Sequence, residues 1–280
     1  MAYSAEITQA NPTCLVFVLG QARSMADPFE GSQTVRKADL VVDAVNRKLQ
    51  DLVVRCAKAE QVKNYYYVSI IRYGGSVEPA FGGALSGQTL VPISEVAEYP
   101  ARTEMRTWIV ADAVSGVGDR PVRFPLPVWI DPRPNGGAHM CEALGLVKAT
   151  LEQWLAEHLT GFPPTVLHLT DSESTDGDPT PIGKDITTLS TDDGPVLLFN
   201  CHVSSVHAEK IEYPTDDSTL PNEFARTLFS ISSQLPGPIQ KAAMQTGVNL
   251  SASARGFVFN GDPVSVFQFF DVGTSPTNLR

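Results

Sequence analysis

Two side chains that could bind a metal ion or a ligand follow strand-like segments of this sequence. Ser24 comes shortly after the apolar run Cys14–Leu19, and Asp171 directly follows the run Thr165–Thr170. In an open α/β sheet, ligands bind beyond the carboxyl ends of the strands. A hydroxyl and a carboxylate at such an edge are oxygen donors of the kind that Mg²⁺ prefers. The two residues are therefore candidates for one shared site.

The positions around these candidates lack ligand side chains. Gly20 supplies neither a charge nor a side-chain oxygen, and Ala22 and Ala138 carry only methyl groups. Arg23 would repel a divalent ion, so tight metal binding is not expected. Arg23 is expected either to pair with Asp171 and fill the place of the metal, or to be a plain exposed side chain.

Several segments, in order along the chain, resemble a von Willebrand factor type A (vWA) domain. Gly20–Met25 resembles the loop in which that family carries Asp-x-Ser-x-Ser, the first part of its metal-ion-dependent adhesion site (MIDAS). Asn135–Cys141 resembles the loop with a coordinating Thr, and Val166–Glu173 resembles the strand and loop with the last acidic residue. The tail around Ala254–Asn260 also fits, so the resemblance runs from about Cys14 to the end of the chain.

The resemblance implies a degenerate site and a particular fold. Its five positions are Gly20, Ala22, Ser24, Ala138 and Asp171, of which only Ser24 and Asp171 keep an oxygen-bearing side chain. The implied fold is α/β, a vWA/Rossmann-like open, mostly parallel central sheet flanked by helices on both faces, with a helical C-terminal extension. The implied function is a non-catalytic protein–protein interaction module. The nearest resemblance is to cytosolic bacterial vWA proteins of stress-response or tellurite-resistance clusters, which would make the chain a subunit or adaptor.

Hydrophobic periodicity predicts elements that agree with this fold. Amphipathic stripes predict helices over Lys37–Cys56 and Cys141–Leu159, and helical pieces from Asn222 that Pro236-Gly237-Pro238 interrupts. The segment Ser76–Pro100 is expected to be hairpin and loop. The domain boundaries are expected at residues 1–13 for a tail, 14–212 for the vWA-like domain and 213–280 for an extension packed on the same domain. The remaining predicted elements are strands at Cys14–Leu19, Tyr65–Tyr73, Met105–Asp112, Thr165–Thr170 and Pro195–Val203, an extended stretch over Pro121–Pro134, and an apolar helix over Val264–Phe270.

Composition excludes several classes of partner. The chain has 280 residues, 42% of them hydrophobic, which is enough for a sizeable core. Its formal net charge of -10 argues against a nucleic-acid partner, because such proteins need clustered Lys and Arg. No apolar run reaches the length of a membrane span, and no basic region precedes the first apolar stretch, so a cytoplasmic protein without a membrane partner is expected.

Other metal and enzyme sites are not supported by the spacing of residues. The acidic loop that begins at Asp171 fails the EF-hand pattern, because its twelfth position is Ile182. The four cysteines are widely separated and predict reduced thiols, and zinc pairs such as His139 with Cys141 lack the usual spacing. No cofactor and no catalytic residue is expected. Two alternatives stay open: a metal-dependent binder that recruits Glu173 or Asp176, and a hydrolase whose site is assembled only in space.

The partner is expected to be another protein that docks at the carboxyl edge of the sheet. Candidate contacts are Gln21, Arg23, His139, Glu173 and Asp176, the last two within the loop from Ser172 to Asp178. Loops at this edge stand clear of the packed sheet and vary without loss of the core. The competing surface is the aromatic-rich C-terminal extension, whose phenylalanines are expected to fill a core instead.

Overall fold

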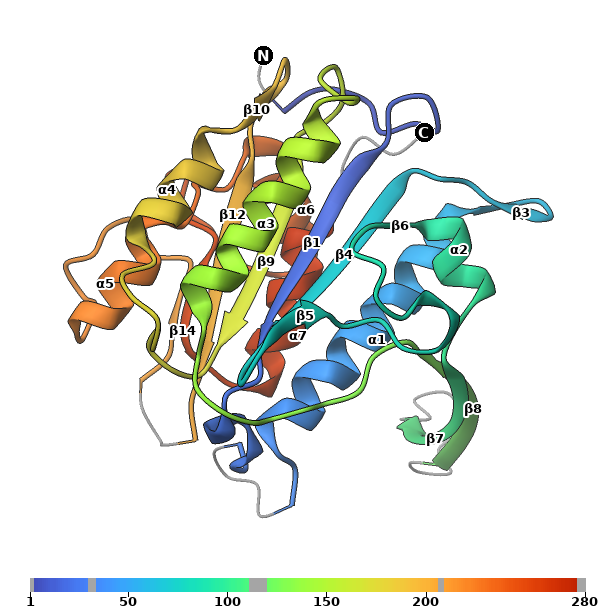
Figure 1. Cartoon of the computed structure of the whole chain (residues 1–280), viewed down its shortest axis with the longest axis horizontal. Coiled ribbons are helices and arrows are strands. Elements are labelled where there is room, and N and C mark those ends of the chain that lie inside the picture. Colours follow the sequence, from blue (N-terminus) through green and yellow to red (C-terminus); the bar gives the residue numbers. More distant parts are fainter. Residues whose placement is uncertain (1–2, 30–33, 111–119, 206–208, 276–280) are drawn as a thin grey trace.

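A mixed sheet forms the centre of the molecule (Figure 1). The computed structural model describes residues 3–29, 34–110, 120–205 and 209–275. The strand order is β13-β14-β12-β9-β1-β4-β5, with β6 also paired to β4. The parallel strands are β1 (Thr13–Gly20), β4 (Tyr66–Tyr73), β9 (Thr165–Thr170), β12 (Leu197–Val203) and β14 (Phe257–Gly261), and the antiparallel ones are β5 (Val77–Pro79), β6 (Val91–Pro92) and β13 (Ile211–Glu212).

Helices cover both faces of this sheet (Figure 1). One face carries α1 (Lys37–Cys56), α2 (Ile93–Glu98), α6 (Gly237–Gln245) and α7 (Pro263–Gly273), and the other carries α3 (Met140–Leu155), α4 (Thr180–Thr188) and α5 (Glu223–Ser230). The smaller elements are η1 (Arg23–Ala26), η2 (Gly83–Leu85), the pair β2 (Ala57–Lys58) and β3 (Gln61–Val62), the pair β10 (Ser190–Thr191) and β11 (Gly194–Pro195), and the hairpin of β7 (Arg102–Val110) and β8 (Arg120–Val128).

The continuous apolar run of β1 follows from its position between two helical layers. All eight of its residues are buried. Phe17 and Leu19 point into the core shared with α1 and α7, and Val16 and Val18 point into the core shared with α3. A strand covered on both faces needs apolar residues at every position rather than at alternate positions. The buried stripe of α1, from Ala38 to Cys56, meets the first of these cores.

The C-terminal segment is part of the central sheet. β14 lies between β12, to which it is parallel, and β13, to which it is antiparallel. Phe269 and Phe270 of α7 are buried in the core that α1 also covers. The boundary expected at residue 212 therefore falls between two paired strands, and the described residues after it, 213–275, share one sheet and one core with the residues before them.

The fold class predicted from the sequence is confirmed: the structure is α/β, with a mostly parallel sheet between two helical layers. The predicted helix Lys37–Cys56 and strand Thr165–Thr170 have the observed bounds. The predicted strand over Met105–Asp112 begins earlier, at Arg102, and its last two residues lie outside the described ones.

Three local predictions differ from the structure, and in each a helix begins at or next to a proline. The segment Ser76–Pro100 contains α2, which begins directly after Pro92. The acidic loop runs into α4, which has Pro181 in its first turn and was not predicted. Pro236-Gly237-Pro238 begins α6 instead of interrupting a helix. Proline is tolerated in the first turn of a helix because no intrahelical N–H bond is lost there.

We expect Gly256→Ala to destabilise the protein because Gly256 touches β12. A Cβ atom at Gly256 would lie 2.1 Å from Cδ1 of Phe199, whereas a Cβ at Gly237 would have nothing within 4 Å. Overpacking of this kind costs about 1–3 kcal/mol of unfolding free energy. Urea denaturation of Gly256→Ala beside the control Gly237→Ala measures the difference. Equal stability of the two variants would mean that the C-terminal segment does not pack on the sheet as described.

Candidate functional site

A buried ion pair lies at the carboxyl edge of the sheet, beyond the ends of β1 and β9. The Lys37 Nζ atom is 2.8 Å from Oδ2 of Asp171, and the side chains of the two residues are 4% and 1% exposed. Lys37 is the first residue of α1, and Asp171 directly follows β9. The N-terminal end of α1 and the C-terminal end of β9 both lie in the lower half of the view in Figure 1. The ammonium group therefore occupies one oxygen of the only acidic side chain at the five MIDAS-like positions.

The second carboxylate oxygen of Asp171 is occupied as well. The Ser24 hydroxyl donates a hydrogen bond of 2.9 Å to Oδ1. Ser24 lies in η1, the short 3-10 helix that follows β1. The backbone N–H of Lys37 donates to the carbonyl of Asp27, just after η1, over 3.0 Å. Asp171 thus joins η1 and α1 to the end of β9. The sequence predicted that Ser24 and Asp171 share one site, and in the structure they are directly hydrogen-bonded.

His202, at the end of β12, is buried beside this pair. Burial lowers the pKa of His202 to about 4, with Asp171 acting to raise it and Lys37 acting to lower it. The backbone N–H of Asn260 donates to Nδ1 of His202 over 3.3 Å, so the ring is neutral with its proton on Nε2. The ring stacks on Phe259 with centroids 4.3 Å apart. His202 therefore adds an uncharged ring to the wall of the site.

The other MIDAS-like positions hold no ligand atoms. Ala22 and Ala138 are 5% and 1% exposed, and both belong to the core shared with α3. A Cβ at Gly20 would lie 3.1 Å from the carbonyl oxygen of Leu169 and 3.3 Å from the Tyr73 hydroxyl. Any side chain at Gly20 would therefore crowd the neighbouring strands, so close packing leaves no room for a carboxylate at this position.

Gln21 holds the loops around the site together. It is 2% exposed. Its Oε1 accepts from the backbone N–H of Arg133 over 2.8 Å, and its backbone carbonyl accepts from Asn135 over 2.8 Å. Its own N–H donates to the carbonyl of Tyr73, at the end of β4. The expectation that Gln21 contacts a partner is therefore corrected, because its side chain faces inward and links β1 and β4 to the segment that leads to α3.

The acidic loop after β9 is fixed to the N-terminus of α3. Oδ1 of Asp176 accepts from the backbone N–H of Cys141 over 3.0 Å, and Oδ2 accepts from Glu142 over 2.9 Å. Burial acts to raise the pKa of Asp176, but these two N–H groups and the Ser174 hydroxyl lower it below its ordinary value. A carboxylate at a helix N-terminus also interacts favourably with the helix dipole. Asp176 is thus a helix cap, whereas Glu173 is exposed.

The residues present do not fit a divalent cation. Such a cation needs several oxygen ligands and usually more than one carboxylate. Oδ2 of Asp171 is in an ion pair with Lys37 but accepts no hydrogen bond from the described residues, and Oδ1 accepts from Ser24. Both oxygens of Asp176 accept from the backbone of α3. Within the part of the chain that the structure describes, no three His, Cys, Asp or Glu side chains gather where they could hold a metal ion.

The cation that pairs with Asp171 is Lys37, and the alternative in which Arg23 pairs with Asp171 was wrong. Arg23 is exposed, as the second of its two expected states requires. Lys37 was not singled out from the sequence, because it was counted only as the start of an amphipathic helix. One signal was present: a lysine in the first turn of a helix opposes the helix dipole. Its place there therefore needs a compensating anion.

A second buried polar chain runs through the sheet beneath α5. The Tyr73 hydroxyl lies 2.7 Å from Nε2 of His168, and Nδ1 of His168 lies 2.8 Å from Oδ1 of Asn200. Asn200 donates in turn to the Ser232 hydroxyl over 2.9 Å. Because Asn200 Oδ1 only accepts, His168 carries its proton on Nδ1 and Tyr73 donates to Nε2. Burial lowers the pKa of His168 to about 4. The chain ties β4, β9 and β12 together.

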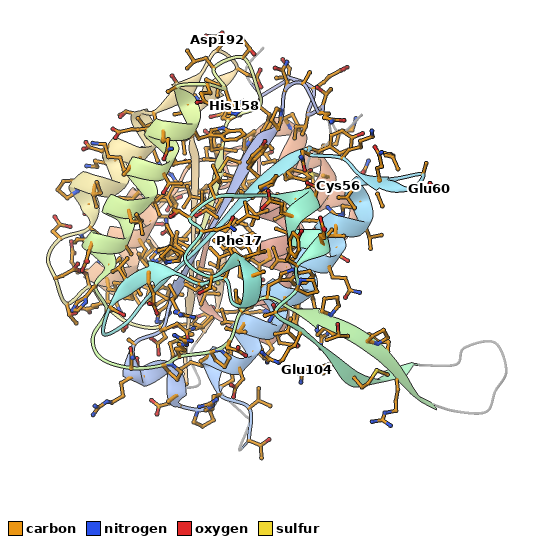
Figure 2. The ribbon with its side chains drawn as sticks, turned by 45° about the vertical axis from the view of Figure 1, so that its right-hand side comes forward. Phe17, Cys56, Glu60, Glu104, His158 and Asp192 are labelled. Carbon is orange, nitrogen blue, oxygen red and sulfur yellow. The ribbon has the colours of Figure 1, made fainter. Side chains whose placement is uncertain are left out.

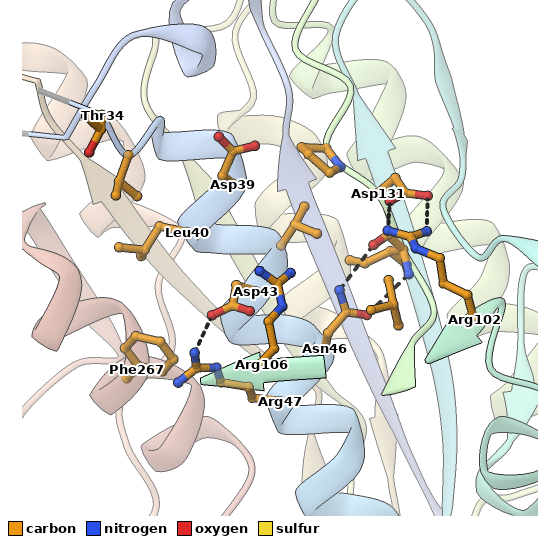
Figure 3. A pocket seen from close by; sticks show the side chains of 15 residues that line it. Thr34, Asp39, Leu40, Asp43, Asn46, Arg47, Arg102, Arg106, Asp131 and Phe267 are labelled. Carbon is orange, nitrogen blue, oxygen red and sulfur yellow. Dashed lines mark hydrogen bonds and ion pairs between the residues drawn. The ribbon is translucent and has the colours of Figure 1, made fainter. Parts of the chain in front are cut away.

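A cavity of about 570 Å³ lies elsewhere, between α1 and the base of the β7–β8 hairpin (Figure 3). Its charged walls are neutralised in pairs: Arg47 lies 2.8 Å from Asp43, and Arg102 lies 2.7 Å from Asp131. Its lining includes neither Lys37 nor Asp171. The cavity is therefore separate from the ion-pair site.

The four cysteines are free, and Cys141 alone among them is partly exposed. His139, half-buried, precedes α3 as its N-terminal flanking residue. Within the described residues, no helix combines the length and apolar character that a membrane span requires.

Comparison with known proteins gives distant likenesses only. No family model matches the sequence, and no curated protein matches it. Among solved structures, the chain is similar to the ArnB paralog VWA2 from Sulfolobus acidocaldarius, with 12% identity and a TM-score of 0.36 over 69% of this chain and 35% of that one. It is similar to manganese-loaded TRAP from Plasmodium vivax, with 12% identity and a TM-score of 0.33 over 71% and 61% of the two chains.

A third similar structure is the vWF domain of the type V pili tip protein Mfa5 from Porphyromonas gingivalis, with 12% identity and a TM-score of 0.32 over 59% of this chain and 39% of that one. Proteins named for vWA or vWF domains are thus among the structures that this chain is similar to. The chain spans less than two thirds of the length of each.

We expect Lys37→Met to lower the free energy of unfolding by about 3–5 kcal/mol, because it leaves a buried carboxylate without its partner. The double variant Lys37→Met/Asp171→Asn removes both charges and keeps a hydrogen-bonding group opposite Ser24. We expect the double variant to lose less stability than the sum of the two single variants. Urea denaturation of all four proteins forms the cycle, and additive losses would contradict a direct ion pair.

We expect stability to fall between about pH 6.5 and pH 4 through the two buried histidines. His168 and His202 have pKa values of about 4 in the folded protein. In the unfolded chain they bind protons below about 6.5, so their contribution is complete above that pH and is lost towards pH 4. At pH 5, each histidine lowers the free energy of unfolding by about 2 kcal/mol relative to its value well above pH 6.5.

The variant His202→Phe isolates one of these contributions. It keeps an aromatic ring against Phe259 and removes the ionisable group. Urea denaturation at pH 7 and pH 5 should give a smaller difference for the variant than for the parent. An unchanged difference would show that His202 is protonated in the folded protein at pH 5.

Proposed function

We propose that this chain is a non-catalytic protein-interaction module of vWA type that works without a metal ion. The observation that carries the proposal is the 2.8 Å contact between Lys37 Nζ and Asp171 Oδ2. An ammonium ion of this chain supplies the positive charge that a divalent cation would supply in a MIDAS. The ammonium group cannot leave the site as a bound ion can, because it is covalently attached to α1, and its side chain is 4% exposed.

An internal cation changes what a partner meets at this edge. A partner carboxylate cannot complete the coordination of an ammonium group that already lies against Asp171 and is closed off from solvent. Recognition must then use the shape and the side chains of the surrounding loops. Those loops are held in one arrangement by Gln21 and by the cap that Asp176 forms on α3. A surface fixed before binding loses little conformational entropy when a partner docks.

The proposed docking surface consists of Arg23, His139, Glu173 and the loop around them at residues 172–178. Arg23 and Glu173 are exposed, and His139 is half-buried. Arg23 is anchored through its backbone, whose N–H donates to the carbonyl of Gly136 over 3.1 Å, and its side chain is therefore free to reach outward from a fixed base. Arginine and histidine supply directional donors for a partner.

We further infer from the sequence resemblance that the protein is an adaptor or subunit in the cytoplasm of a bacterium. It would act in a stress-response or tellurite-resistance system. The partner is another protein. An interaction or adhesion role agrees with the α/β fold, and the lack of ligand atoms at Gly20, Ala22 and Ala138 supports a role without metal.

The proposal predicts that binding partners are retained without divalent ions. Immobilised protein should recover the same partners from a host extract in Mg²⁺ and in EDTA, and millimolar Mg²⁺ or Mn²⁺ should leave its melting temperature unchanged, since an ion that bound only the folded state would raise it. Loss of partners in EDTA with recovery in Mg²⁺ would favour a metal-dependent binder that uses substitute acidic ligands.

A charge reversal locates the docking surface. Arg23→Glu should remove partners, whereas Lys58→Glu, the same change at an exposed residue of β2, should keep them. β2 continues from the C-terminal end of α1, at the opposite end of that helix from Lys37. Recovery of partners at parental levels by a folded Arg23→Glu variant would move the docking surface away from this edge.

A further inference from the structure

The hairpin of β7 and β8 stands apart from the central sheet. The two strands pair only with each other among the described strands, over nine residue pairs from Arg102 opposite Val128 to Val110 opposite Arg120. In Figure 2 the hairpin projects from the body of the molecule at the lower right. A two-stranded sheet has two edges, and each edge presents backbone N–H and C=O groups that a further strand could pair with.

Prolines close one of these edges. β8 carries Pro121, Pro125 and Pro127, all at odd-numbered positions. Proline has no N–H, so the ladder with β7 is made by the even-numbered residues of β8, and the odd-numbered residues face the outer edge. Three of the odd positions on that edge therefore have no donor. A strand added there would lose the bonds that those donors would make.

The outer edge of β7 is open. β7 contains no proline. Thr103 and Met105 lie opposite Pro127 and Pro125, which have no N–H to donate, so these are pairs without backbone hydrogen bonds. The N–H and C=O groups of Thr103 and Met105 therefore point away from β8. Thr103 is exposed, and Met105 is 56% exposed. The two edges of the hairpin therefore differ. Prolines block the edge of β8, whereas the exposed edge of β7 can pair with a further strand.

The base of the hairpin is held rigidly, so this edge has a fixed direction. Arg102 makes two hydrogen bonds to Asp131, of 2.9 and 2.7 Å. The side chain of Asn46, on α1, accepts from the backbone N–H of Trp129 over 2.8 Å and donates to the carbonyl of Ile130 over 3.1 Å. Val128 is 3% exposed. A partner strand would therefore meet an edge that is already ordered.

The charges of β7 select the partner. Glu104 lies between Arg102 and Arg106, and its carboxylate contacts both of them at 2.6 and 2.9 Å. We propose that β7 pairs antiparallel with β7 of a second copy of this chain, with Met105 opposite Met105 on the twofold axis. In that register Glu104 of each copy faces Arg106 of the other. A shift by one position on each strand, which places Glu104 opposite Glu104, sets like charges against each other.

This register also satisfies the backbone. Two strands pair through residues whose N–H and C=O groups both point to the shared edge. With Met105 on the axis, the odd-numbered residues of one copy face the odd-numbered residues of the other. Glu104 and Arg106 then form a pair without backbone hydrogen bonds, in which side chains approach most closely. The result is a four-stranded intermolecular sheet whose two outer edges are the proline-bearing strands, so the assembly stops at two copies.

Met105→Pro tests the open edge directly. Position 105 does not donate to β8, so proline there leaves the hairpin ladder intact and removes a donor from the outer edge. The control Met105→Val removes the same side chain and keeps the N–H. Analytical ultracentrifugation over a range of concentrations should show a reversible dimer for the parent and for Met105→Val, and weakening of at least about tenfold for Met105→Pro.

A charge exchange tests the register. Glu104→Arg should weaken the dimer, and Glu104→Arg/Arg106→Glu should restore it, because the two positions face each other across the axis. Circular dichroism and melting temperature confirm that each variant is folded. A parent that stays monomeric at millimolar concentration would overturn the proposal, as would a dimer that Met105→Pro leaves unchanged. Failure of the charge exchange to restore the dimer would overturn the register and with it the assignment of Met105 to the axis.

Discussion

The ion pair between Lys37 and Asp171 is the constraint on which the arrangement of the carboxyl edge depends. A carboxylate buried to 1% exposure requires a positive partner, and the structure supplies it from the first residue of α1. The same contact resolves a second difficulty, since a lysine in the first turn of a helix is opposed by the helix dipole and an adjacent carboxylate reverses that effect. One interaction therefore sets where α1 begins, where η1 lies, and how the chain leaves β9.

Other contacts at this edge link the ends of the remaining parallel strands to one another and to α3. Gln21 joins the ends of β1 and β4, Asp176 joins the loop after β9 to α3, and His202 closes the site from β12. Burial keeps His168 and His202 neutral at physiological pH, and each ring is held by neighbours inside the protein. Internal contacts thus hold the loops at the carboxyl edge of the sheet in one arrangement.

Local patterns in the sequence were sufficient for much of the fold. The apolar run of β1 and the stripe of α1 are repeated signals over many residues, and both elements were predicted correctly. The pairing of Ser24 with Asp171 followed from the rule that parallel strands end at one edge. Lys37 was missed because its burial depends on a residue 134 positions away along the chain. Gln21 was misjudged because a polar side chain in a loop gives no local sign that backbone groups of another loop will enclose it.

The position of β14 has a consequence for synthesis of the chain. During translation the strands β1, β4, β9 and β12 emerge first and can pair, but the neighbour of β12 on its far side is made of residues 257–261. Until those residues leave the ribosome, the edge of β12 is exposed, and the core that Phe269 and Phe270 fill is incomplete. A nascent chain in that state presents an apolar strand edge of the kind that binds chaperones or other nascent chains. Truncation of the chain before residue 257 should therefore cause aggregation of the product, even though both residues of the carboxyl-edge ion pair are still present.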